Sequence, residues 1–498
     1  MSLTRKVAVN TSALAAGRVV TAVAGVLSVA ISTRYLGLDT YGALVTAVAL
    51  VAVIGALADV GISAIGAREI AKHRDQTERL LGGTLTATLM LTGPAALIGA
   101  LAAFIAYSGP GEELQRTGVL VLIAPMPITA LAAAYGAWFV AEQRAYLGTV
   151  SSIGAAVIQL AILLVVVALD LGYVGVVAAY ASQALASSAI SVAIGTRHVR
   201  IRPWLNLRLG WRLLVWAAPL GFNKLVAVLY ARFDILMLSL MASARAVALY
   251  GLAFKLIDFL TLIPNYATIT LLPEFAKLAD LRERFTRVLS AAMSVMETAA
   301  LGLVAFFMVF ADEAVQVVGG SKFEDSADLL RILVLGAGLA YVTNVIAQAL
   351  IAVNEQKRLV ILSLVGFPVN AVVNVALIPV LGASGAAIAF VAAELLDVVL
   401  LVGIYKRAGR TFPMPERVPQ RLIAACLAAS VGLIKVIPVE GLAVAWLTLA
   451  VGGLGFLVVY GGSLYLLRAM PPVVHQNLVR PVWGRVRGSL RTATVKAH

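Results

Sequence analysis

The chain has 498 residues, of which 61% are apolar and 13% are charged. A soluble domain has about 45–50% apolar and about 25% charged residues, so this composition excludes a cytosolic enzyme and a disordered chain. In a soluble protein the net charge of +14 would suggest a nucleic-acid partner. In this chain the meaning of the net charge depends on where the charged residues lie. Apolar stretches of about 20 residues predict membrane spans. We therefore expect an all-α polytopic membrane protein.

Fourteen apolar segments follow one another along the chain. They cover roughly residues 8–33, 41–65, 80–106, 118–140, 147–169, 172–194, 212–238, 247–273, 286–311, 327–352, 358–379, 384–404, 421–437 and 442–467. The segments between them are too short for a soluble catalytic domain. The chain contains neither a phosphate-binding GxxxxGK[ST] loop nor an HExxH or Cys/His metal motif. We expect no enzymatic activity, no cofactor and no metal.

The lysines and arginines lie mainly on one side of these spans. Of the 39, the segments that include both termini hold 29, the opposite segments hold six, and four lie inside spans. Such a bias indicates the cytoplasmic side, so we expect both termini in the cytoplasm. The excess charge is then topological and does not indicate a nucleic-acid partner. The basic tail, 471–498, is expected to lie on anionic lipid headgroups or to remain solvated.

Short sequence landmarks recur about 210 residues apart. They are YG at 41–42 and 250–251, EQR at 142–144 with EQK at 355–357, and LGYVG at 171–175 with LGASG at 381–385. This spacing predicts a duplicated six-span unit in parallel orientation, a design found in transporters. We expect two pseudo-symmetric six-helix lobes, 1–200 and 201–410, followed by an additional helix pair, 411–470.

A positive charge near the middle of a span costs about 2.5–3.5 kcal/mol unless it meets a partner or water. Arg18 lies near the middle of span 1, on a narrow face with Thr11, Gly25 and Ser32 at intervals of seven residues. Lys224 lies at a similar depth in span 7, the equivalent helix of the second lobe. The pattern predicts that both residues line a cavity and bind an anionic substrate. A structural ion pair with a neighbouring acid is the alternative.

Two further cations are weaker candidates for substrate binding. Arg232 lies near the outer end of span 7, from where it could reach the interface. Lys255 lies in span 8, and Asp258 three residues later is close enough for a local pair. Asp258 is also a candidate for coupling transport to an ion.

Other acids lie within the spans. Glu297 and Glu394 are at about mid-depth, where an acid can carry a proton or sodium ion or can neutralise a cation such as Arg18. Asp59 and Asp234 lie near span ends, where water could solvate them. The residues leave open which acids are structural and which couple to an ion.

The chain resembles the polysaccharide transporters, including bacterial oligosaccharide flippases, of the multidrug/oligosaccharidyl-lipid/polysaccharide exporter superfamily. The resemblance covers residues 5–467 and depends on RYLG at 34–37, YG at 41–42, DVGI at 59–62, ARE at 67–69, LPEF at 272–275 and GASGAA at 382–387. No single motif is specific to this superfamily. Their order along two sets of six spans and a final pair of spans is specific.

The resemblance implies two six-helix lobes that alternate access across the inner membrane. It implies as cargo an oligosaccharide linked to a polyprenyl (di)phosphate, moved to the outer leaflet for surface polysaccharide synthesis. Polymerase or ligase machinery would be a possible partner. Two alternatives stay open: a membrane-embedded ligase or polymerase, and an ion-coupled small-molecule exporter. The sugar, the energy source and the oligomeric state do not follow from the sequence.

Overall fold

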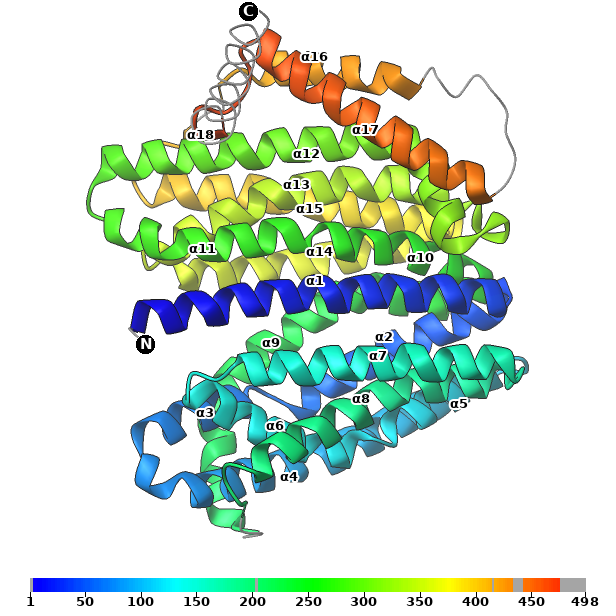
Figure 1. Ribbon diagram of the computed structural model, residues 1–498, viewed down its shortest axis with the longest axis vertical. Helices are drawn as coiled ribbons and strands as arrows, with labels where there is room; N and C mark the ends of the chain where they lie inside the picture. Colours follow the sequence, from blue (N-terminus) through cyan, green and yellow to red (C-terminus); the bar gives the residue numbers. More distant parts are fainter. Residues whose placement is uncertain (1–2, 202–204, 414–415, 433–441, 475–498) are drawn as a thin grey trace, which may run out of the picture. The chain divides into compact units, whose positions relative to one another are not determined.

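The computed structural model describes residues 3–201, 205–413, 416–432 and 442–474, and within these ranges every regular element is helical (Figure 1). The predicted basic tail lies outside the described residues from residue 475 on.

The helices follow the predicted spans in order. They are α1 (Leu3–Tyr35), α2 (Leu38–Ala58), α3 (Ile62–Lys72), α4 (Thr77–Ala106), α5 (Glu113–Ile123), α6 (Met126–Ala141), α7 (Tyr146–Ala168), α8 (Gly172–Thr196), α9 (Leu207–Met241), α10 (Ala244–Leu260), α11 (Leu262–Leu278), α12 (Arg282–Gly319), α13 (Ser326–Ala352), α14 (Gln356–Leu381), α15 (Ala383–Arg407), α16 (Val418–Ala429), α17 (Leu442–Leu466) and α18 (Pro472–Val474). Two short 3-10 turns, η1 (Arg74–Gln76) and η2 (Ser321–Phe323), complete the order.

Most of these helices are long and apolar enough to cross a bilayer. In the described part of the chain eleven helical segments pass this test, with α2 and α3 together forming one of them. Twelve pass when α5 and α6, which are bent by 42°, also count as one span. The other two predicted spans correspond to α10 with α11, which are interrupted at Thr261, and to the short α16. The prediction of an all-α polytopic membrane protein is confirmed.

The helices form two compact units. Unit 1 comprises Met1–Lys255, Val318–Phe323 and Ala371–Ala386, and unit 2 comprises Leu256–Val317, Glu324–Asn370 and Ala387–His498. The sequence repeat predicts that α9 belongs to the second lobe, whereas α9 packs against α2, α3 and α4 and belongs to unit 1. The predicted lobe boundaries themselves stay a prediction.

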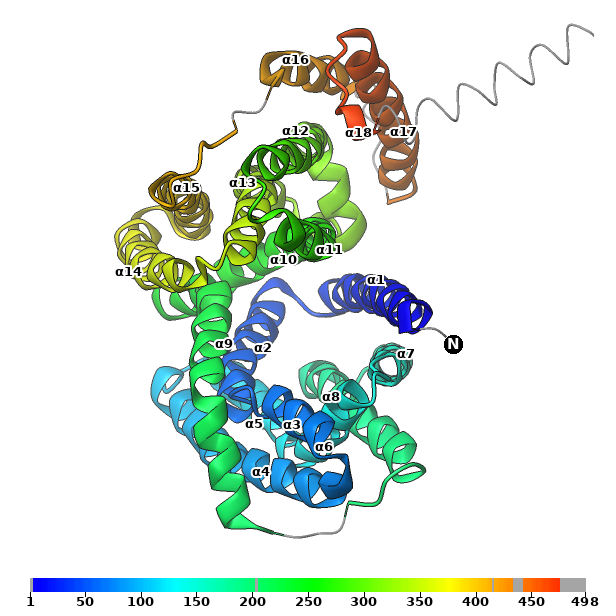
Figure 2. The ribbon, with the colours of Figure 1, turned by 90° about the vertical axis from the view of Figure 1, so that its left-hand side faces the viewer.

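Unit 1 contains a tight hairpin of α7 and α8, with α1 packed along α7 (Figures 1 and 2). The close approach of α1 to α7 requires glycine at position 17, because a Cβ there would lie 1.9 Å from Cγ2 of Thr149. At its far end α1 is held by Tyr35, whose hydroxyl donates to Asp170 Oδ1 over 2.7 Å and accepts from the Gly172 amide over 2.8 Å. This anchoring keeps α1 beside the hairpin.

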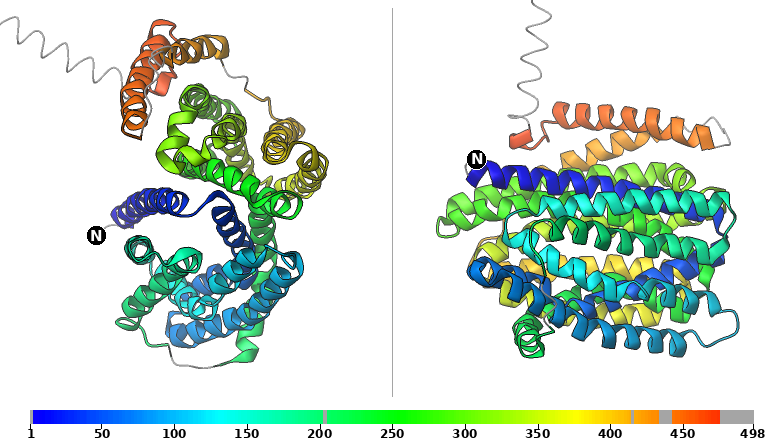
Figure 3. Two further views of the ribbon diagram at one scale, coloured as in Figure 1. Left: turned by 90° about the vertical axis from the view of Figure 1, so that its right-hand side faces the viewer. Right: turned by 60° about the horizontal axis from the view of Figure 1, so that its bottom comes forward.

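Unit 2 has two adjoining apolar cores. One lies between α11, α12, α13 and α15 and buries Phe275, Phe285, Tyr341 and Tyr405 completely or almost completely. The other joins α16 and α17, the orange helices of Figure 3, to α12 through Phe310, Phe456 and Tyr460. The added helix pair is therefore packed onto unit 2.

Backbone turns recur with the spacing of the sequence landmarks. Gly111 and Gly320, Gln143 and Asn354, and Gly172 and Gly382 all have positive φ, and the members of each pair are 209 to 211 residues apart. A positive φ is rare outside tight turns. A duplicated unit would place the same turn at the same position in both copies, about 210 residues apart.

Candidate functional site

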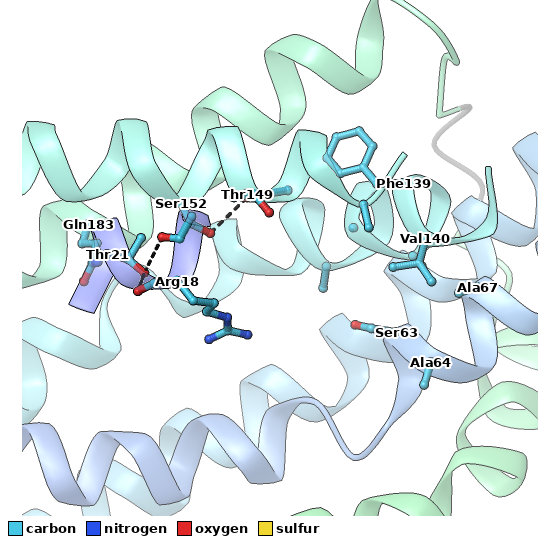
Figure 4. A pocket seen from close by; sticks show the side chains of 16 residues that line it. Arg18, Thr21, Ser63, Ala64, Ala67, Phe139, Val140, Thr149, Ser152 and Gln183 are labelled. Carbon is cyan, nitrogen blue, oxygen red and sulfur yellow. Dashed lines mark hydrogen bonds between the residues drawn. The ribbon is translucent and has the colours of Figure 1, made fainter. Parts of the chain in front are cut away.

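Unit 1 contains an open cavity of about 740 Å³ (Figure 4). Its walls come from α1, α3, α6, α7 and α8, and most of the side chains are small or carry one hydroxyl or amide group. They are Gly17, Arg18, Thr21, Ser63, Ala64, Ala67, Ala133, Gly136, Ala137, Phe139, Val140, Ala145, Gly148, Thr149, Ser152 and Gln183. The small residues create the space. At Gly136 a Cβ would meet nothing within 4 Å.

Arg18 supplies the charge of this cavity. Its side chain is exposed and extends from α1 into the open space opposite Ser63 (Figure 4). Among the side chains that the structure describes, none forms an ion pair with Arg18. Its neighbour Thr21 donates its hydroxyl back to the carbonyls of Gly17 and Arg18. An exposed guanidinium in a membrane-spanning helix needs water or an anionic ligand.

The cavity lies toward one end of the spans. Its lining residues come from the last turns of α6, the first turns of α7 and the first half of α3, next to the loop that contains Arg144. The sequence predicts that this end is cytoplasmic. Two arginines lie near this end: Arg74 is 3.9 Å from Glu142, and Arg144 lies over the Trp138 ring.

Lys255 also reaches the polar face of α1. A Cβ built at Gly25 would lie 3.9 Å from the Lys255 ammonium, in ordinary contact with it. Gly25 follows Arg18 by seven residues, or about 10 Å along a helix. Further on, the hydroxyl of Ser32 lies 3.3 Å from that of Tyr180. The described part of the predicted face therefore faces polar groups, while Thr11 lies outside the described side chains.

Lys224 is placed differently from Arg18. Its ammonium lies 2.6 Å from Asp59 Oδ2, so α9 is joined to the junction between α2 and α3. The side chains of Lys224 and Asp59 are 44% and 28% exposed. The sequence predicts that Arg18 and Lys224 lie in opposite lobes, whereas both lie in unit 1. For Lys224 the geometry matches the alternative of an ion pair, and substrate binding stays a prediction.

Asp234 on α9 is a buried acid. It is only 6% exposed, and it accepts hydrogen bonds from Asn374 over 2.8 Å and from Tyr250 over 3.2 Å. The expectation that water solvates it at a span end is wrong. Arg232, two residues earlier on α9, is half-buried. A buried carboxylate with polar neighbours can hold a proton or an alkali cation.

The three predicted ion-coupling acids lie in unit 2. Glu297 on α12 forms an ion pair of 3.0 Å with Arg421 on α16. Glu394 on α15 is half-buried and lies one turn from Asp397. Asp258 lies near the end of α10, three residues after Lys255. Within the described ranges no group of three or more His, Cys, Asp or Glu residues could hold a metal ion.

A bundle of apolar helices around a cavity lined by one arginine defines the class: a multi-pass helical membrane protein with a cavity among its helices. The chain belongs to the polysaccharide biosynthesis protein family, whose profile matches residues 7–279. The MatE profile matches residues 219–376. These matches confirm the resemblance to the multidrug/oligosaccharidyl-lipid/polysaccharide exporter superfamily.

Known proteins resemble the chain in sequence and in fold. The probable flippase AglR of Haloferax volcanii is 24% identical over 242 residues, which are 47% of this chain and 48% of that protein. The lipid II flippase MurJ, in an inward closed conformation, has a TM-score of 0.75 at 12% identity, covering 90% of this chain and 97% of MurJ. An inward-facing multidrug resistance MATE family transporter has a TM-score of 0.66 at 16% identity, covering 78% and 94%. At these identities the solved structures show the shared fold.

Proposed function

We propose that this protein is a flippase. Its cargo is an oligosaccharide linked to a polyprenyl (di)phosphate, which it moves by alternating access from the cytoplasmic to the outer leaflet for surface polysaccharide synthesis. It acts in the inner membrane with both termini in the cytoplasm, and it changes no covalent bond of the cargo. Family membership supports a role in polysaccharide biosynthesis, and the similarity to the probable flippase AglR supports flippase activity.

One observation carries this proposal: Arg18 is exposed in a cavity at the end of the spans where the basic loops lie. The planar guanidinium of arginine can donate two parallel hydrogen bonds to a phosphate. The hydroxyl and amide groups around it, from Thr21, Ser63 and Gln183, are suited to sugar hydroxyls. The volume falls within the range of ligand sites, roughly 300–1,000 Å³.

Transport of an ion-coupled small molecule is the second candidate. The MatE match and the buried Asp234 favour it. A multidrug cargo that is cationic would however be repelled by Arg18 and Lys255, which line or approach the polar face of α1. An anionic headgroup agrees better with both cations.

Reconstituted protein tests the proposal directly. Liposomes would contain undecaprenyl diphosphate with one labelled sugar, and the fraction protected from a membrane-impermeant sugar oxidant would be followed over time. We expect the wild type to move label between leaflets, and Arg18→Ala to move much less at equal folded protein. Mass spectrometry of the recovered lipid should show an unchanged mass. A new mass would indicate an enzyme, and no movement by the wild type would contradict the flippase.

A further inference from the structure

The ion pair of Lys224 and Asp59 lies close to the wall of the Arg18 cavity. Asp59 uses both carboxylate oxygens: Oδ2 accepts from Lys224 over 2.6 Å, and Oδ1 accepts from the Ser63 hydroxyl over 3.0 Å. Ser63 itself lines the cavity. Lys224 is therefore two hydrogen bonds away from the site proposed for the cargo phosphate.

A break between two helices produces this arrangement. Asp59 ends α2, and Gly61, with φ of 77°, begins α3 in the left-handed region that glycine adopts without strain. The break aims the Asp59 side chain at the first turn of α3, where Oδ1 also accepts from the Ser63 amide over 3.3 Å. Asp59 thus caps α3 with one oxygen and holds Lys224 with the other.

The pair is exposed although it lies within the spans. Lys224 is near the middle of α9, a helix of 35 residues or about 52 Å, which is longer than the ~30 Å hydrocarbon core. A lysine that is 44% exposed at this depth needs water or an anionic partner. Ion pairs open to water are weak. A phosphate, with more negative charge and more acceptor oxygens than a carboxylate, could therefore take Lys224 from Asp59.

We propose that Asp59 competes with the anionic cargo for Lys224. In the cargo-free state Asp59 holds the ammonium, and the phosphate of the cargo replaces the carboxylate when it enters the cavity. Asp59 thereby lowers the affinity of a cationic site, so that cargo can also be released. This inference rests on the proposed function, because it requires a phosphate in the Arg18 cavity.

A double-mutant cycle on the purified full-length protein tests the competition. The probe is farnesyl diphosphate, a short prenyl diphosphate, and farnesol controls for binding of the prenyl chain. Asp59→Asn keeps an oxygen that can cap α3 but removes the charge that holds Lys224. We expect this variant to bind farnesyl diphosphate about two- to fivefold more tightly. We expect Lys224→Met to weaken binding, and to weaken it more in the Asp59→Asn background than in the wild type.

A purely structural ion pair would change the affinity for farnesyl diphosphate in the opposite direction. If Lys224 only held the α2–α3 junction in place, Asp59→Asn would weaken binding, and Lys224→Met would then cost little more. Either result, or unchanged affinity in Asp59→Asn, overturns the inference. Thermal unfolding of the same samples separates loss of fold from loss of affinity. Glu274→Gln is the matched control, because it removes one carboxylate from an exposed lysine pair in unit 2.

The proposed function is tested by two other comparisons in the same experiment: wild type against Arg18→Ala, and farnesyl diphosphate against farnesol. Wild-type binding that requires the diphosphate and is lost in Arg18→Ala supports it, and the cycle then decides the role of Asp59. Equal binding of farnesol and farnesyl diphosphate by the wild type contradicts the proposed function, and the inference with it.

Discussion

The guanidinium of Arg421 donates to Glu297 Oε2 over 3.0 Å in the interior of unit 2, with 3% of the Arg421 side chain and 12% of the Glu297 side chain exposed. The same guanidinium donates to the carbonyl of Ala469 over 3.1 Å. These bonds join α16 and the end of the α17 segment to α12. Glu297 therefore has a cationic partner inside its own unit, which favours a structural role over ion coupling.

Removing one member of this pair should destabilise the protein. A buried charge that loses its partner costs about 3–5 kcal/mol, so Glu297→Gln and Arg421→Met should each lower the unfolding temperature. The double variant should lose less than the sum of the two. Unfolding of purified protein by fluorescence or calorimetry would measure this. The exposed pair of Glu274 and Lys277, at 3.4 Å, is the control, and Glu274→Gln should change little. A Glu297→Gln variant with normal stability and altered ion dependence would instead support coupling.

Arg18→Ala should strongly reduce transport and leave folding intact. No described acid pairs with Arg18, so its removal strands no buried charge. The lost charge-assisted hydrogen bonds are worth about 1.5–3 kcal/mol, or roughly tenfold to 150-fold in affinity. Arg18→Lys should retain part of the activity, because the charge remains while the two-pronged contact is lost. Transport per folded protein, measured with the unfolding temperature of the same samples, distinguishes a loss of cargo binding from a loss of folding. Normal transport by Arg18→Ala would remove Arg18 from the binding site.

The sequence predicted some of these relationships because their causes are local. Each span needs about 20 apolar residues, so the order of helices could be predicted, and the seven-residue spacing of Arg18, Gly25 and Ser32 predicted a shared polar face. The partners of the other charges could not be predicted. Asp59 lies 165 residues from Lys224, and Asn374 lies 140 residues from Asp234. These groups meet only in the folded protein, where α9 packs against α2 and where Asn374 on α14 donates a hydrogen bond to Asp234 on α9.

Filling the cavity from Gly136 should block cargo. A side chain at this position of α6 would project into open cavity space, since a Cβ there has no neighbour within 4 Å. Gly136→Ala should be tolerated, and Gly136→Leu should reduce transport without lowering the unfolding temperature. Gly462→Leu is the matched control, because it adds the same side chain at an exposed helical glycine that also has open space. Equal transport by Gly136→Leu and Gly462→Leu would show that cargo does not occupy this space.

Substitutions at Gly25 test whether Lys255 approaches α1. At Gly25 an alanine Cβ would make ordinary contacts of 3.8 and 3.9 Å with the end of Lys255, whereas a leucine would displace the ammonium. Gly25→Ala should therefore transport normally, and Gly25→Leu should lose about as much as Lys255→Met. Binding of farnesyl diphosphate and transport would both be measured. If Lys255→Met alone is harmless, the ammonium does not contribute to binding.

The orientation of the chain decides the direction in which the cavity loads. The 29-to-6 distribution of lysine and arginine predicts that the end of α15, at Arg407, is cytoplasmic and that Asp325, just before α13, is outside. The cavity lies at the end of the spans shared with the Arg144 loop, which the same rule makes cytoplasmic. A green fluorescent protein fused after Arg407 should fluoresce, and one exported unfolded after Asp325 should not. Alkaline phosphatase fusions at the same two sites should give the reverse pattern. If both reporters showed the opposite activities, the cavity would open to the outside, and transport toward the outer leaflet could not begin there.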